Sequence, residues 1–210
     1  STNHCVTFVA RLGPCLLRYS LIEGMSHRAP LARPIIHLGA TSCYVTDNGD
    51  LLICHEALRL LRRRLLDVIA ALAAFADQWK AQPTLGFTHF QPAQPTTVGK
   101  RACLWIQDLL LDLEDLDHVL ATTPVRGVKG TTGTQASFLT LFAGDHGKVR
   151  ELDARVAAGL GFAGSIAVSG QTYTRKLDSQ LLATLSGVAE SCHKMGTDLR
   201  LLQGVGELAE

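Results

Sequence analysis

A single histidine stands in a polar run that could carry acid–base chemistry. Residues 84–97 are mainly Thr, Gln, Pro and Phe around His89. Histidine donates and accepts protons near neutral pH, and a loop fixed between rigid elements can position such a group. The alternative is a histidine that only bonds neighbouring backbone, and the residues alone favour neither interpretation.

Two adjacent hydroxyl residues, Thr41 and Ser42, stand where a long helical pattern begins. The first turn of a helix has unpaired backbone N–H groups and the positive end of the helix dipole. Two hydroxyls there could hold a carboxylate or a phosphate. An ordinary Ser/Thr cap with Asp47 nearby is the alternative, and physical argument alone favours the cap.

A third polar segment combines glycines with threonines at residues 127–134. Glycines let a chain pass close to a ligand, although the spacing is not that of a P-loop. Gln135 follows at the mouth of the next helical pattern and offers both donor and acceptor atoms.

Long amphipathic patterns must position these three segments. Apolar residues recur at intervals of three and four over about 42–81, 97–121 and 171–203, with shorter helices expected at 135–142 and 146–158. The intervening residues 83–96 and 122–134 are expected to be loops. Helices this long need one another, or copies from other chains, along their length. The sequence therefore predicts an all-α fold, a long-helix bundle that continues across subunits.

Domain organisation follows from the same patterns. Residues 1–33 show weak periodicity and stay unassigned, whereas residues 34–210 are expected to form one partial helical-bundle domain.

Composition excludes several classes of protein. The 210 residues are 47% hydrophobic and 19% charged, with a formal net charge of +1, which argues against a nucleic-acid partner. The apolar run at 68–76 is too short to span a membrane, and charged and Gly-Pro breaks disfavour a secretory signal at 6–22. Six cysteines without a CxxC pair or finger spacing indicate reduced thiols in a cytoplasmic protein, with no metal site.

Five stretches together resemble the adenylosuccinate lyase family, within the fumarase/aspartase superfamily, and above all its eukaryotic-type members. They occur in the expected order, at residues 39–44, 88–94, 127–137, 170–176 and 192–200. Each stretch alone is weak, but the combination is specific and covers about residues 34–203.

The resemblance implies a β-elimination that releases fumarate from adenylosuccinate, giving AMP, and from the succinyl-aminoimidazole-carboxamide ribotide of purine biosynthesis. It also implies a small-molecule nucleotide substrate, no cofactor or metal, and a homotetramer whose active sites are shared between subunits. His89 matches the family's general acid, and substrate-binding residues are matched by Thr41, Ser42, Thr88 and Gln135. Such a reaction needs an acid for the departing amine and hydrogen bonds for the carboxylates.

Two departures from the family pattern limit what these 210 residues are expected to do alone. The family's catalytic base is a serine on a loop that also bears a lysine, expected after the third long helix, and residues 204–210 do not follow that pattern. The family's histidine-bearing upstream segment is not reproduced in residues 1–33. We therefore expect a truncated chain that is inactive by itself.

Two other functions stay open at this point. One is another fumarate-releasing lyase, of the argininosuccinate lyase or fumarase type, although the context of His89 argues against it. The other is a catalytically silent helical oligomerisation scaffold derived from the family.

Overall fold

The computed structural model describes residues 24, 27–32, 34, 35 and 37–208. Of the predicted unassigned segment, residues 1–33, only 24 and 27–32 lie within the described residues. Within the described part of the chain, no helix combines the length and the apolar character that crossing a membrane requires.

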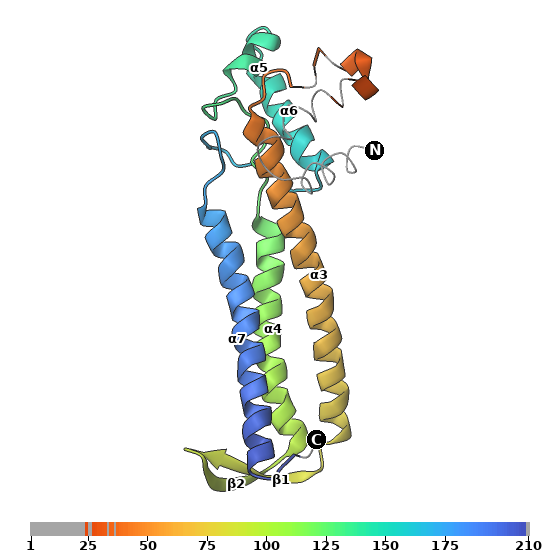
Figure 1. The fold of residues 1–210 in the computed structure, drawn as a ribbon, viewed down its shortest axis with the longest axis vertical. Coiled ribbons are helices and arrows are strands. Elements are labelled where there is room, and N and C mark those ends of the chain that lie inside the picture. The colour runs from red at the N-terminus through yellow and green to blue at the C-terminus, as the bar shows by residue number, and fades with distance from the viewer. Residues whose placement is uncertain (1–23, 25–26, 33, 36, 209–210) are drawn as a thin grey trace. The chain divides into compact units, whose positions relative to one another are not determined.

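The described residues are predominantly helical, and the predicted helices are confirmed (Figure 1). The elements in chain order are η1 (Pro30–Ala32), α3 (Ser42–Gln78), β1 (Pro83–Thr88), β2 (Gln91–Thr97), α4 (Val98–Thr122), α5 (Ala136–Leu141), α6 (His146–Gly159) and α7 (Lys176–Gly204).

One predicted loop, residues 83–96, is instead a β-hairpin. Strands β1 and β2 pair antiparallel, Thr88 lies opposite Gln91, and the register is irregular between Leu85 and Phe87. Threonine and phenylalanine favour extended backbone. The prolines of β2 concealed the strand in the sequence, but a two-stranded sheet has open edges on which a residue without an N–H is tolerated.

The chain forms two compact units, and each is built from two separate stretches. Unit 1 comprises the described residues up to Ala57 together with Ala121–Leu177. Unit 2 comprises Leu58–Leu120 and Asp178–Glu210. Helix α3 therefore contributes residues to both units.

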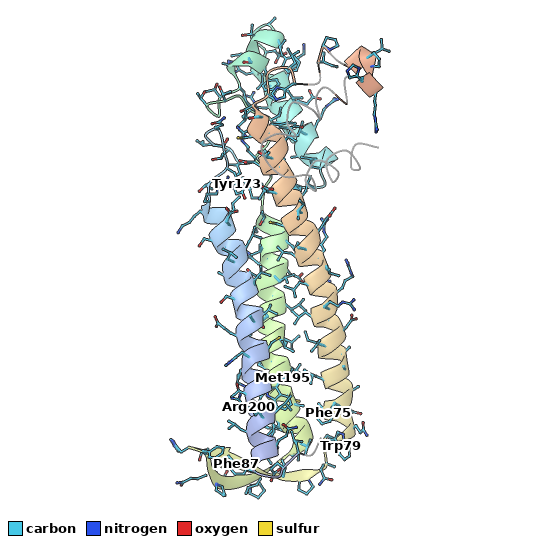
Figure 2. The ribbon with its side chains drawn as sticks, viewed as in Figure 1. Phe75, Trp79, Phe87, Tyr173, Met195 and Arg200 are labelled. Carbon is cyan, nitrogen blue, oxygen red and sulfur yellow. The ribbon has the colours of Figure 1, made fainter. Side chains whose placement is uncertain are left out.

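Unit 2 is held together by the apolar faces of three helices. Its core cluster joins Ala76 of α3, Ala102 and Trp105 of α4, and Leu202 of α7, with Met195 packed against them (Figure 2). The Trp105 indole Nε1 donates to the Asp198 carboxylate at 2.9 Å. The apolar stripes predicted for α3 and α4 are confirmed as buried or half-buried, whereas the stripe of α7 leaves Leu185, Cys192 and Leu199 exposed.

Unit 1 has two core clusters, one around the first turns of α3 and one between α5 and α6. Leu51 of α3 packs with Val125, Ala157, Phe162 and Tyr173. The other cluster is formed by Val128, Phe138 and Val149.

Helix α7 begins five residues later than the pattern predicts, at Lys176 rather than 171. The Tyr173 N–H donates to the carboxylate of Asp47 in α3 at 2.7 Å, and the backbone of that segment serves this contact instead of a helical turn.

Candidate active site

The N-terminus of α3 carries a buried hydroxyl that has no hydrogen-bond partner among the described residues. Thr41 is only 2% exposed, and its Oγ1 has no hydrogen-bond partner among the described residues. Its backbone N–H donates to the Lys129 carbonyl at 3.2 Å, and its carbonyl accepts from the Tyr44 N–H at 3.0 Å. Ser42, half-buried, is the first residue of the helix. The Thr41 hydroxyl therefore does not act as a helix cap within the described residues.

The Gly-rich loop, residues 126–135, lies against that helix start. Two of its glycines are needed for the backbone conformation of the loop. Gly127 and Gly133 both have φ +80°, and a Cβ would collide with Asp153 at the first and with the Ser169 carbonyl at the second. The Gln135 amide Nε2 donates to the Val128 carbonyl at 3.0 Å. Thr41 and Gln135 thus bind neighbouring backbone carbonyls of one loop, so the structure brings these two predicted site residues together in unit 1.

Two polar residues of α3, Asp47 and Asn48, hold the segment 170–176 and the Gly-rich loop against this helix. The Asn48 amide bonds both backbone groups of Gly127, accepting from its N–H and donating to its carbonyl, each at 3.2 Å. Asp47, besides binding Tyr173, lies 3.8 Å from the Arg175 guanidinium. The side chains of adjacent positions in α3 therefore hold two loops that are distant in sequence.

A buried lysine and aspartate pin the start of the Gly-rich loop. Lys129 Nζ donates to the Ile166 carbonyl at 2.7 Å and lies 3.4 Å from Asp153 Oδ2. Asp153 also accepts from the Val128 N–H at 2.7 Å and from the Ser165 hydroxyl. Burial lowers the pKa of Lys129, and the Asp153 carboxylate opposes that shift.

The predicted acid lies in unit 2, on the turn of the hairpin. His89 and Phe90 form the two-residue connection between β1 and β2, with φ of 52° and 56°. Positive φ at both central residues is the geometry of a tight hairpin turn, which usually selects glycine or asparagine. Thr88 and His89 are both exposed, and the His89 imidazole makes no hydrogen bond to another described residue. Its alternative role as a backbone-bonded histidine is therefore not supported.

A cavity of about 330 Å³ in unit 2 adjoins this turn and was not predicted from the sequence. Phe87 and Phe90 line it together with Arg101, whose guanidinium donates to the Leu85 carbonyl at 2.7 Å and lies 3.7 Å from Glu207. Arg101 carried no signal in the sequence beyond its charge. Among the described residues, no group of three or more His, Cys, Asp or Glu is arranged to hold a metal ion.

Comparison with solved structures shows the fold. A fumarate lyase from Mesorhizobium matches with a TM-score of 0.74 and 24% identity, covering 95% of this chain and 48% of the other. The β-carboxy-cis,cis-muconate cycloisomerase of Acinetobacter calcoaceticus matches with a TM-score of 0.73 and 24% identity, covering 88% and 41%. The predicted long-helix fold of the fumarase/aspartase type is confirmed.

The family model described as "Lyase" matches residues 18–209, and the chain therefore belongs to this lyase family. Within it, the chain is similar to adenylosuccinate lyases. That of Saccharomyces cerevisiae is 55% identical over 90% of this chain, and that of Schizosaccharomyces pombe is 54% identical over 87%. The resemblance predicted from the motifs is confirmed. The chain spans about two fifths of the length of these relatives, 39% and 38% respectively.

Proposed function

We propose that the protein containing this chain is a C–N lyase of purine biosynthesis that releases fumarate from adenylosuccinate and from succinyl-aminoimidazole-carboxamide ribotide. The similarity to adenylosuccinate lyases over nine tenths of the chain supports this reaction and a nucleotide substrate.

The observation that carries the proposal is the unpaired, buried hydroxyl of Thr41. A buried hydroxyl without a partner costs free energy unless a ligand completes it. It stands at the start of a 37-residue helix, where the positive end of the helix dipole favours an anion. A succinyl carboxylate held there would accept from Thr41, with Ser42 beside it and Gln135 on the neighbouring loop.

His89 supplies the proton in the proposed elimination. A base removes a proton from the succinyl carbon next to the C–N bond, the electron pair forms the double bond of fumarate, and the C–N bond breaks. The departing amine then takes its proton from the His89 imidazole, which is exposed on the hairpin turn next to Thr88. The resemblance assigns the base to a serine outside these residues, so this chain would supply the acid and the anion-binding part.

The assembly and location also belong to the proposal. The exposed apolar side chains of α3, α4 and α7 support a homotetramer with shared active sites. The absence of a disulfide among the four described cysteines is compatible with a cytoplasmic location.

Fumarate release, followed by absorbance, tests the reaction in the complete reading frame that contains these 210 residues. His89→Ala should lower turnover by about 10² to 10⁴-fold, as the loss of a general acid does. His146→Ala, an exposed histidine at the start of α6 and outside the five stretches, is the matched control and should leave turnover unchanged. Near wild-type turnover in His89→Ala would remove the acid assignment. Release of fumarate from argininosuccinate but not from adenylosuccinate would favour another lyase, and no release from any succinyl substrate would favour the silent scaffold.

A further inference from the structure

A fully buried arginine in unit 1 has no role in the proposed chemistry. Arg126 is 0% exposed, and its Nη2 donates to the carbonyls of Gly130 at 3.2 Å and Gly170 at 3.0 Å. Nη1 lies 3.5 Å from the Lys129 carbonyl, and Nε has no partner among the described residues.

The carbonyls that this guanidinium binds belong to two separate motif segments. Gly130 precedes the threonines of the Gly-rich loop, whereas Gly170 lies 44 positions from Arg126, immediately before Gln171. The Lys129 carbonyl also accepts from the Thr41 N–H. One planar group therefore connects the Gly-rich loop to the segment 170–176, and the backbone at Lys129 connects both to the start of α3.

The burial of this cation is costly, and the structure offers it little compensation. No described carboxylate lies within ion-pairing distance of it, and burial lowers its pKa, while Asp47, Cys43 and Asp153 act in the opposite direction. A neutral side chain would avoid this desolvation. The planar guanidinium has several donors in a fixed geometry, which a lysine ammonium does not reproduce.

We propose that Arg126 is a positioning residue, whose guanidinium fixes the Gly-rich loop and the segment 170–176 in one arrangement against the N-terminus of α3. The functional part of this inference rests on the proposed function, because it assumes that these loops bind the substrate. The mechanical part does not: Arg126 makes two loops one rigid body whatever the ligand.

Three variants of the complete reading frame separate the geometry of Arg126 from its charge. Arg126→Lys keeps the charge and loses the planar group. Arg126→Ala loses both, and added guanidinium ion at non-denaturing concentration can refill the space. Arg155→Ala, whose exposed side chain only pairs with Glu151 on the same helix, is the control.

For Arg126→Lys we expect kcat/KM to fall by about 10-fold or more, mainly through KM, because small displacements of binding groups have large kinetic effects. Guanidinium ion should recover part of the lost kcat/KM in Arg126→Ala and leave the wild type and the control unchanged. Amide hydrogen exchange should accelerate together in residues 128–134 and 169–173 of Arg126→Lys, and stay slow in Arg155→Ala.

The exchange measurement distinguishes failure of this inference from failure of the proposed function. If the wild type releases no fumarate, the proposed function fails, and the exchange rates alone decide whether Arg126 couples the loops. Wild-type kinetics and exchange in Arg126→Lys would overturn the inference. So would global unfolding of Arg126→Lys, since the residue would then support the whole unit rather than two loops. If Arg126→Ala does not fold, Arg126→Lys decides the outcome.

Discussion

The hydroxyl of Thr41 and the backbone of Phe90 are two examples of an unfavourable arrangement carried by a single residue. Thr41 buries a polar atom without a partner among the described residues, and Phe90 holds a bulky side chain at φ 56° while 65% exposed. Strain of either kind persists where the surrounding structure or a ligand requires it.

Thr41→Val separates binding from stability. Valine has the same shape and removes the unpaired hydroxyl, so the melting temperature should stay the same or rise. Substrate binding should weaken by about 1–3 kcal/mol if the hydroxyl donates to a carboxylate. Thr184→Val in α7 is the control, because that hydroxyl donates to the Gln180 carbonyl at 3.2 Å. It should lose stability and keep its KM. A Thr41→Val protein with lower stability and unchanged KM would show a structural hydroxyl.

Phe90→Gly should strengthen the hairpin. Glycine adopts positive φ without the steric cost of about 1–2 kcal/mol that a side chain carries, although its greater freedom in the unfolded chain offsets part of that gain. Slower amide exchange across β1 and β2 is the expected result. Phe87→Gly, within β1 and half-buried, should accelerate exchange instead. Faster exchange in Phe90→Gly would mean that the phenyl ring stabilises the turn.

The sequence indicated the residues of the proposed site, but not the residues that surround them. His89, Thr41 and Gln135 stood out because they lie in polar segments at or between long helical patterns. Arg126 and Lys129 did not, because their partners are carbonyls and carboxylates up to 44 positions away. Contacts of that kind have no local signature, since backbone carbonyls are present at every residue.

At the scale of elements, the close approach of α3 and α4 depends on one glycine. A Cβ on Gly99 would collide with the Ala76 carbonyl and lie 2.7 Å from the Lys80 Cα. Gly99→Ala should therefore reduce the free energy of unfolding by about 1–3 kcal/mol, as overpacking does. Gly196→Ala in α7 is the matched control, and it should raise the free energy of unfolding. Nothing lies within 4 Å of a Cβ built at Gly196, and alanine is more favourable than glycine in a helix by up to about 1 kcal/mol. Denaturant melts of both variants check the pair, and equal effects would contradict the packing argument.

The Lys129–Asp153 pair connects the Gly-rich loop to α6 and should make stability depend on pH. Burial lowers the folded pKa of Lys129 below its ordinary value of 10.5, so the unfolded chain binds more protons between the two values. Stability of the wild type relative to Lys129→Met should therefore rise as pH increases from neutral toward 10.5.

Denaturant unfolding at neutral pH and about one unit below the ordinary lysine pKa measures this difference. Lys80→Met is the control. Asp77 raises the pKa of the exposed Lys80, so any contribution of that pair to the stability of the fold decreases as pH rises. A Lys129→Met difference that does not change with pH would show that the buried lysine has an ordinary pKa.

The helices could be predicted because their apolar residues repeat over many turns, and a long repeat averages out local exceptions. The hairpin could not, because Pro92 and Pro95 interrupt the pattern that identifies a strand. The start of α7 was misplaced for another reason. Tyr173 continues the apolar stripe in sequence, but its N–H bonds Asp47 of α3, and this tertiary contact outweighs the local pattern.

For the whole molecule, the surface of unit 2 predicts association. Large apolar side chains remain exposed on each of its helices, among them Leu60, Leu104, Leu111, Leu182 and Leu201. Such surfaces usually mark interfaces. The 210 residues by themselves should form oligomers at micromolar concentration in sedimentation velocity, and Leu111→Lys with Leu182→Lys should reduce their size. A monodisperse monomer would contradict the interface.

The same 210 residues should release no measurable fumarate. They contain the proposed acid but not the serine to which the resemblance assigns the base, and loss of one member of a cooperating set costs several orders of magnitude in rate. Absorbance at the end of a long incubation is a sufficient test, with the complete reading frame as the positive control. Robust release would show that the base lies within these residues.

The interleaving of the two units also sets when they can form during synthesis on the ribosome. Asp47 binds a residue 126 positions further along the chain, and Thr84 binds Glu207, 123 positions away. At about 5–20 residues per second, the partner of Asp47 is made about 6–25 s after Asp47 itself. Throughout that interval Leu51 of α3 lacks Phe162 and Tyr173, two of the residues that cover it, so unit 1 cannot complete this core until residue 173 has been translated.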